Sequence, residues 1–289
     1  MATTSPCNAQ GHGIHSTHIL DFGHADTATK CNTTVITAYY KVPSKHSYEE
    51  YLAWMTNFLT IHDCLVVFVD PEQEHTMRSL RPAMYPTLII PRAIESFLIS
   101  TMVSSEEWDK QEQMDHERGI GHNKLLYSVW NEKTNFMKIA ADMNPFSSSY
   151  FVWLDIGAMR HSEYNHQLMV RRRPQEAGCL MLNIEPYTEK DKELTEGRSL
   201  TDFTHMDRIG AGTICCDRDS LDTWHEAYYK TIRNHLAEGR FVGKEQNIMA
   251  TTCLETTVCL LVTSGDWFRL QPWLRGELDD NYTRMDLNY

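Results

Sequence analysis

The chain has 289 residues, of which 42% are hydrophobic and 23% are charged. This composition is globular and excludes a wholly disordered chain, and the length allows one large α/β domain or two small ones. Lysine and arginine number 27 against 39 acidic residues, which gives a formal net charge of -12. Because such a chain repels nucleic acid and anionic membrane surfaces, we expect no nucleic-acid partner.

Eight cysteines occur at positions 7, 31, 64, 179, 215, 216, 253 and 259, without a Cys-x-x-Cys pair or a regular spacing. Several lie in apolar runs, so the sequence predicts reduced, buried thiols rather than a disulfide framework or a zinc site. Residues 1–30 lack the cationic start and apolar block of a secretory signal. No apolar run reaches the roughly 20 residues that span a bilayer. We therefore expect a cytoplasmic protein without a transmembrane segment.

The first third of the chain has the pattern of a nucleotide-binding sheet. Residues 1–32, rich in Thr, Ser, Gly and His, are predicted to be a partly disordered extension. A β-branched run at 33–40 predicts a strand, and Ser47 opens a helix with a capping box. Apolar runs at 64–69 and 87–91 predict two further strands, the first of which is followed by Asp70. Ligands of such α/β sheets lie beyond the carboxyl ends of the strands.

Two helices, at 105–118 and 122–142, and a buried strand at 150–154 are predicted next. Lys124 falls in the first turn of the second helix, where a cation is unfavourable unless an anion lies nearby; an ordinary surface lysine is the alternative. Asp155 follows the buried strand directly. We expect its carboxylate to face a metal-bound diphosphate, and the alternative is a turn residue after a core strand.

The remainder of the chain continues the α/β pattern without a linker between two domains. Strands are predicted at 179–184, 209–217 and 257–262, and helices from Ser220 to Gly239 and at 244–254. The charged connection at 188–203 is expected to be mobile. We predict one domain at 33–270, followed by a C-terminal tail at 271–289.

Three acids fall at the ends of predicted elements: Asp70, Asp155 and Glu245. In a doubly wound sheet such ends meet at one crevice. Asp70 suits hydrogen bonds to a base or ribose, and Asp155 suits a hard divalent cation with the phosphates it bridges. Glu245, beside Gln246, suits sugar hydroxyls and can supply a general base; compensation of the helix dipole is its alternative role.

Four segments together resemble the HtrL/YibB-like (WlaTC) family of predicted bacterial glycosyltransferases. They are residues 37–41, 151–160, 210–213 and 243–246, and they occur in the order of the family. The resemblance covers residues 33–267 and implies a GT-A fold, a Rossmann-like α/β domain with a mostly parallel central sheet flanked by helices. It also implies transfer of a sugar from a nucleotide-diphosphate sugar to a glycan or other hydroxyl acceptor.

The resemblance further implies roles for single residues. Glu245 and Gln246 would be catalytic, facing the transferred sugar and the acceptor. Asp155 would hold a Mn²⁺ or Mg²⁺ ion, and Lys124 would approach the diphosphate or the donor sugar. The full set expected to bind the nucleotide sugar is Thr37, Ala38, Tyr39, Lys41, Asp70, Lys124, Asp155 and Gly157.

One position departs from the wider GT-A superfamily, whose metal-dependent members mostly carry Asp-x-Asp. The third position here is Gly157. One carboxylate with phosphates and water can still hold Mg²⁺ or Mn²⁺, and Asp266 is a candidate second ligand. Two functions stay open: an active glycosyltransferase, and a catalytically silent nucleotide-sugar or glycan binding module. Another Rossmann-like nucleotide enzyme is disfavoured, because no glycine-rich phosphate loop follows the first strand.

Overall fold

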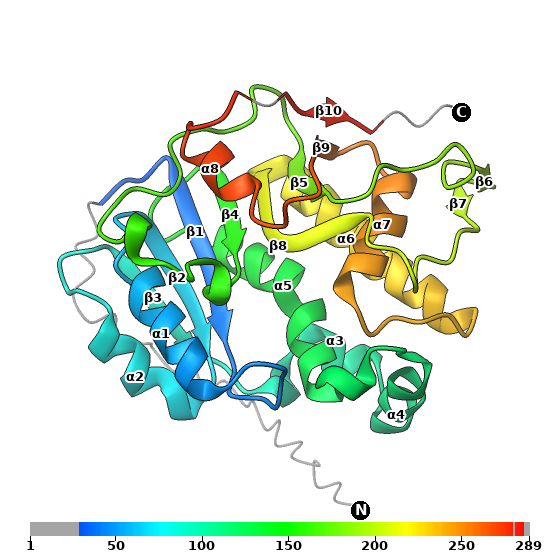
Figure 1. The fold of residues 1–289 in the computed structure, drawn as a ribbon, viewed down its shortest axis with the longest axis horizontal. Helices are drawn as coiled ribbons and strands as arrows, with labels where there is room; N and C mark the ends of the chain where they lie inside the picture. Colours follow the sequence, from blue (N-terminus) through cyan, green and yellow to red (C-terminus); the bar gives the residue numbers. More distant parts are fainter. Residues whose placement is uncertain (1–28, 280, 286–289) are drawn as a thin grey trace, which may run out of the picture.

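A computed structural model describes residues 29–279 and 281–285 of the chain. An eight-stranded sheet runs across the molecule from β3 to β10 (Figure 1). Its strands are β1 (Thr33–Tyr39), β2 (Cys64–Val69), β3 (Thr87–Pro91), β4 (Tyr150–Leu154), β5 (Cys179–Asn183), β8 (Ile209–Asp217), β9 (Cys259–Thr263) and β10 (Thr283–Arg284). A separate hairpin consists of β6 (Leu194–Thr195) and β7 (Arg198–Ser199). The predicted α/β class and every predicted strand are confirmed.

The order of the strands is β10-β9-β5-β8-β4-β1-β2-β3. Neighbouring strands are parallel except that β8 is antiparallel to β4 and β5, and β10 is antiparallel to β9. From β1 the chain adds β2 and β3 on one side and then returns to place β4 on the other. The strand order therefore reverses between β1 and β4, which is where open α/β sheets bind their ligands.

Helices cover both faces of the sheet, so the strands are buried on both sides. Val35 and Ile36, adjacent in β1, point into the two separate cores. One core receives side chains from α1, α2 and α8, and the other from α3, α4, α5, α6 and α7. The helices are α1 (Tyr48–Phe58), α2 (Glu74–Leu80), α3 (Leu98–Met102), α4 (Ser105–Met114), α5 (Lys124–Met143), α6 (Arg218–Ala237), α7 (Glu245–Glu255) and α8 (Leu270–Leu274).

Local capping explains where several helices begin and end. The predicted capping box of α1 is present, because the Ser47 and Glu50 side chains each bond the other's backbone N–H. The predicted helix at 105–118 ends earlier, at Met114, because the Asp115 carboxylate accepts the Glu117 N–H at 2.8 Å and turns the chain. The helix predicted to start with Ser220 as its cap begins earlier, at Arg218, because Asp217 caps it by accepting the Ser220 N–H.

Six of the cysteines form disulfides, and Cys215 is free and buried. The pairs are Cys31–Cys64, Cys179–Cys216 and Cys253–Cys259. The prediction of reduced thiols is wrong for these six residues. Cys179 and Cys216 are 37 residues apart, yet they are opposite one another on antiparallel strands. Disulfides persist mainly in oxidising compartments, so they favour an extracytoplasmic setting over the predicted cytoplasmic one. Among the described helices, none has the length and apolar character to cross a membrane.

The segments predicted as extension, mobile connection and tail contain ordered contacts. Residues 1–28 of the predicted extension lie outside the described residues, while the Cys31 N–H donates to Phe146 O at 3.0 Å. The connection at 188–203 carries the β6–β7 hairpin, where the Ser199 N–H donates to Glu255 at 3.0 Å. The predicted tail begins inside α8, and its Trp273 is completely buried.

Candidate functional site

A cavity of about 880 Å³ opens at the carboxyl ends of β1 and β4, the point where the strand order reverses. This volume is in the range of pockets that enclose small ligands, roughly 300–1,000 Å³. The walls come from the end of β1 and the loop at 41–46, from α1 and α5, from the turn at 155–160, and from β8, the start of α7 and residues 267–271. The cavity therefore gathers two of the three acids that the sequence singled out at the ends of elements, Asp155 and Glu245.

Most of the predicted site residues line this cavity, and three do not. Those that line it are Ala38, Tyr39, Lys41, Asp155, Gly157, Glu245 and Gln246. Thr37 is fully buried in β1, and no described residue forms a hydrogen bond with its hydroxyl. Asp70 caps the turn after β2 by accepting the Glu72 N–H at 3.0 Å. Lys124 pairs with Asp109 of α4 at 2.7 Å, away from the cavity lining.

Lys133, in the middle of α5, joins the two acids Asp155 and Glu245. Its ammonium nitrogen lies 2.8 Å from Asp155 Oδ1 and 2.8 Å from Glu245 Oε1. It also donates to Ala211 O of β8 at 3.3 Å. Burial acts to lower the pKa of Lys133, but the two carboxylates outweigh burial and raise that pKa above its ordinary value. Lys133 therefore keeps its charge, and its two ion pairs hold Asp155 and Glu245 in place.

The Lys133 side chain is 5% exposed and that of Glu245 is 6% exposed, whereas Asp155 keeps 41% of its side-chain surface exposed. Asp155 is the member of the cluster that a ligand can reach. Its Oδ1 also accepts the Trp153 Nε1–H at 2.7 Å, and its backbone N–H donates to Gly212 O at 2.9 Å. These bonds anchor Asp155 to its own strand and to β8.

Whether the site fits the divalent cation implied by the resemblance depends on which oxygens of Asp155 are free to bind it. Oδ1 is engaged by Lys133 and Trp153, while no described residue bonds Oδ2. One free carboxylate oxygen fits a Mg²⁺ or Mn²⁺ ion that takes its other ligands from phosphates and water. Asp266, the candidate second ligand, lines a smaller neighbouring cavity of about 230 Å³ and accepts the Phe268 N–H at 3.0 Å.

Gly157 stands where the Asp-x-Asp pattern would place a second acid. A Cβ atom at this position would lie 3.1 Å from Cε3 of Trp54 in α1, closer than ordinary contact. An aspartate there would require the indole ring to shift by a few tenths of an ångström. The turn therefore carries a single acid, and a glycine at position 157 lets Trp54 pack against it.

Three cations at the cavity have no carboxylate partner among the described residues: Lys41, Lys45 and Arg160. The Arg160 guanidinium lies 4.7 Å from the ring of Trp54 and 5.2 Å from that of Phe268. Cations held by aromatic faces rather than by acids keep their charge available to an anion. The cavity therefore suits an anionic ligand, although the chain as a whole is acidic.

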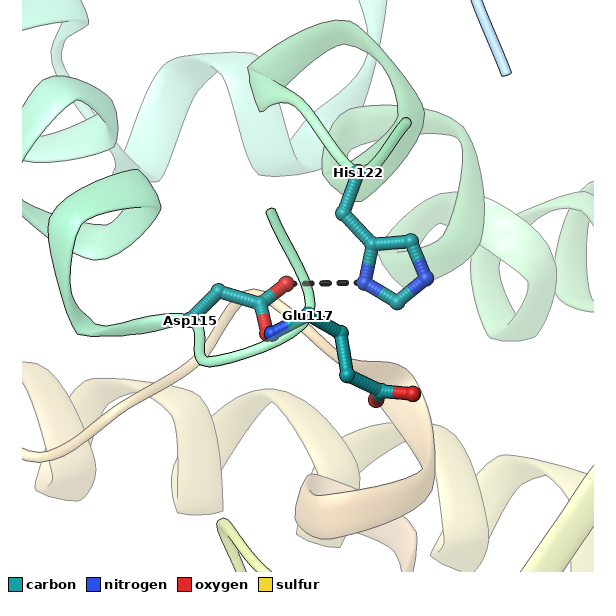
Figure 2. Close-up of side chains that lie close together, drawn as sticks. All are labelled: Asp115, Glu117 and His122. Carbon is teal, nitrogen blue, oxygen red and sulfur yellow. Dashed lines mark hydrogen bonds and ion pairs between the residues drawn. The ribbon is translucent and has the colours of Figure 1, made fainter. Parts of the chain in front are cut away.

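A second polar group at the cavity consists of Asp115, Glu117 and His122 (Figure 2). Their ligand atoms lie within 4.8 Å of one another, which makes this a possible metal-binding group. His122 Nδ1 is 2.8 Å from Asp115 Oδ2, an oxygen that also accepts the Tyr127 O–H at 2.8 Å. Burial acts to raise the pKa of Asp115, but hydrogen bonds from Glu117, Tyr127 and His122 lower it below its ordinary value.

The sequence reasoning missed Lys133 and this second group. A signal for Lys133 was present, because it lies between Trp130 and Phe136 on the apolar face predicted for its helix. A lysine in such a stripe must find a charged partner when the helix is buried. Asp115 and His122 fell at the predicted end of one helix and start of the next, where polar residues are ordinary.

Comparison with known proteins adds one finding. Residues 31–275 match the family described as "Bacterial protein of unknown function (HtrL_YibB)". No curated protein matches the chain.

Proposed function

The chain belongs to the HtrL_YibB family, whose description names no activity, and we propose that it is a glycosyltransferase. It would move a sugar from a nucleotide-diphosphate sugar to a glycan or other hydroxyl acceptor. The observation that carries this proposal is that Lys133 pairs with both Asp155 and Glu245 at the cavity. Asp155 directly follows β4, and Glu245 is the first residue of α7. The two acids lie at the edge of the sheet where α/β proteins bind nucleotides.

The donor would lie along the cavity with its nucleoside near the end of β1. Tyr39 lies beside Tyr48 and Tyr51, with ring centroids 6.5 and 5.7 Å away, and these rings offer apolar faces to a base. Lys41, together with Arg160, would contact the diphosphate. Lys124 has no part in this arrangement, because Asp109 already neutralises it.

Asp155 Oδ2 would hold Mn²⁺ or Mg²⁺ when the ion is bound, and the ion would supply positive charge to the departing diphosphate. Lys133 fixes the carboxylate in orientation through its contact with Oδ1. Glu245, held by Lys133, would accept hydrogen bonds from sugar hydroxyls. The Gln246 side-chain N–H donates to Ile209 O at 3.2 Å, which leaves its amide oxygen for the sugar or acceptor.

A binding module without turnover is the second candidate. It is favoured by Gly157, since the chain has one acid where metal-dependent enzymes mostly have two. Such a module would keep the aromatic and cationic walls of the cavity and would bind a nucleotide sugar or a glycan. It would differ from the transferase only in leaving the donor intact.

Hydrolysis of a panel of UDP- and GDP-linked sugars, with Mn²⁺ present, tests the proposal. We expect one donor to be hydrolysed by the wild-type protein, and Asp155→Asn to lower that rate by about 10²–10³-fold, the usual effect of removing a group that stabilises the transition state. Circular dichroism checks that the variant is folded. Binding without hydrolysis supports the binding module, and absence of both rejects the whole proposal. If the Asp155→Asn variant still hydrolyses the donor at the wild-type rate, Asp155 is a turn residue only.

A further inference from the structure

The Asp115–His122 pair has the geometry of a histidine oriented by a carboxylate. The side chains of His122 and Asp115 are 8% and 0% exposed, and the bond between them is 2.8 Å long. Since an ionised carboxylate only accepts hydrogen bonds, the proton of the neutral imidazole lies on Nδ1. Nε2 is then the unprotonated nitrogen, with a lone pair to offer.

The position of Asp115 is fixed by three donors. Its Oδ2 accepts from Tyr127 as well as His122, and its Oδ1 accepts the Glu117 N–H at 2.8 Å. The imidazole ring is held from another side by Trp130, whose ring centroid lies 4.9 Å away at an interplanar angle of 88°. These contacts leave His122 little freedom to turn.

His122 lines the cavity, and no described residue bonds its Nε2. Trp130, which touches the imidazole, is one turn of α5 before Lys133. Residues three apart on a helix are neighbours on one face. His122 and Lys133 therefore border the same cavity, one aromatic side chain apart, and Asp155 lines that cavity as well.

The other acids that could take a proton in this cavity are mostly engaged. Glu245 and Asp155 are paired with Lys133, and Glu117 is paired with Lys244. In each of these three residues an ammonium group already occupies one carboxylate oxygen. Asp207 also lines the cavity, but no described side chain orients its carboxylate.

A metal ion at Asp115, Glu117 and His122 would have to displace existing partners. Both oxygens of Asp115 are already hydrogen-bonded, and the ammonium of Lys244 contacts Glu117. The group is thus assembled to orient the imidazole, and proton transfer is the chemistry that this arrangement favours.

We propose that His122 is the catalytic base of the transfer and that Asp115 is its positioning residue; this inference rests on the proposed glycosyltransferase function. The acceptor oxygen forms a bond to the anomeric carbon while the bond from that carbon to the donor phosphate breaks. The electron pair of the broken bond leaves with the diphosphate. The acceptor proton moves to Nε2 and then to solvent. Because there is one displacement, the anomeric configuration of the sugar is inverted.

The test uses the full-length protein and the donor that wild type hydrolyses, with methanol as acceptor. We expect His122→Gln to lower kcat by about 10²–10⁴-fold, the range of general base catalysis, while calorimetry shows donor binding within about twofold of wild type. Asp115→Asn should also lower kcat, and added imidazole should partly rescue His122→Gly. Asp207→Asn, the matched control, should keep its kcat. NMR of the methyl glycoside should show inversion.

Each failure has a distinct result. If wild type neither binds nor hydrolyses a nucleotide sugar, the proposed function itself fails. If wild type turns over and His122→Gln keeps its kcat, or the methyl glycoside retains its configuration, only the role of His122 is overturned. If calorimetry shows Zn²⁺ or Mn²⁺ binding that His122→Gln abolishes, the group is a metal site and His122 is not the base.

Discussion

Two lysines of α5, nine residues apart, form ion pairs of similar length that differ in their exposure to water. Lys124 lies 2.7 Å from Asp109, and Lys133 lies 2.8 Å from each of two acids, so the contacts are equally short. The Lys124 side chain, however, is 41% exposed and that of Lys133 is 5% exposed. Water screens the Lys124–Asp109 pair, whereas the pair of Lys133 with Glu245, whose side chains are at most 6% exposed, is shielded from water. Burial rather than contact distance therefore separates the structural cluster of the site from a surface ion pair.

The largest effect should come from Lys133→Met, which leaves Asp155 and Glu245 without their buried cation. We expect a loss of about 3–5 kcal/mol in the free energy of unfolding, the usual cost of breaking a buried ion pair. Urea denaturation followed by tryptophan fluorescence measures this change. A loss below 1 kcal/mol would mean that Lys133 is no more important than a surface lysine.

Neutralising Asp155 and Glu245 together with Lys133 should separate the effect of the buried charges from the effect of packing. Lys133→Met combined with Asp155→Asn and Glu245→Gln leaves no unpaired charge, so it should regain at least about 2 kcal/mol over Lys133→Met alone. The same urea titration measures the recovery. If the triple variant is less stable than the single one, the loss comes from packing of the lysine stem and not from charge.

Acid denaturation tests whether a buried, hydrogen-bonded carboxylate contributes more to the free energy of unfolding than an exposed one. The pKa of Asp115 is lowered in the folded protein, so its contribution is fully present above the unfolded value, near pH 4, and is lost as pH falls through the lower folded value. Wild type should thus lose stability below about pH 4 more steeply than Asp115→Asn, which at neutral pH should cost roughly 1–3 kcal/mol. Denaturation at several pH values measures both. The exposed Asp109→Asn is the control, and a profile equal to that of Asp115→Asn would contradict the argument.

The smallest effect should come from Lys124→Met. An exposed pair contributes about 0–1 kcal/mol, and we expect hydrolysis of the donor to stay within about twofold of wild type. Thermal unfolding and the hydrolysis assay measure the two quantities. A large loss of activity with unchanged stability would return Lys124 to the diphosphate, as the sequence resemblance implied.

Much of the fold could be predicted because its signals are local. Apolar runs such as 64–69, and the capping box at Ser47, determine strands and helix starts from neighbouring residues alone. The antiparallel direction of β8 was not predictable in this way, because a buried strand has the same pattern in either direction. The pairing of Cys179 with Cys216 depends on that direction and was missed with it.

The candidate site could be predicted in part from position along the chain. Asp155 directly follows a predicted strand and Glu245 lies at the start of a predicted helix, and such ends meet at one crevice of a doubly wound sheet. Lys133 and Glu245 are 112 residues apart, and only the packing of α5 against α7 brings them together. The Asp115–His122 pair likewise depends on the turn between two helices, which no periodicity encodes.

The packing of Trp54 on Gly157 constrains how this site can evolve. A second acid at 157 would push the indole, and the indole also supports Arg160 at 4.7 Å. An aspartate at 157 would shift Trp54 by a few tenths of an ångström, and with it the aromatic face against which the Arg160 guanidinium lies. Positions 54, 157 and 160 are therefore coupled, and a substitution at one of them changes which residues the other two can hold.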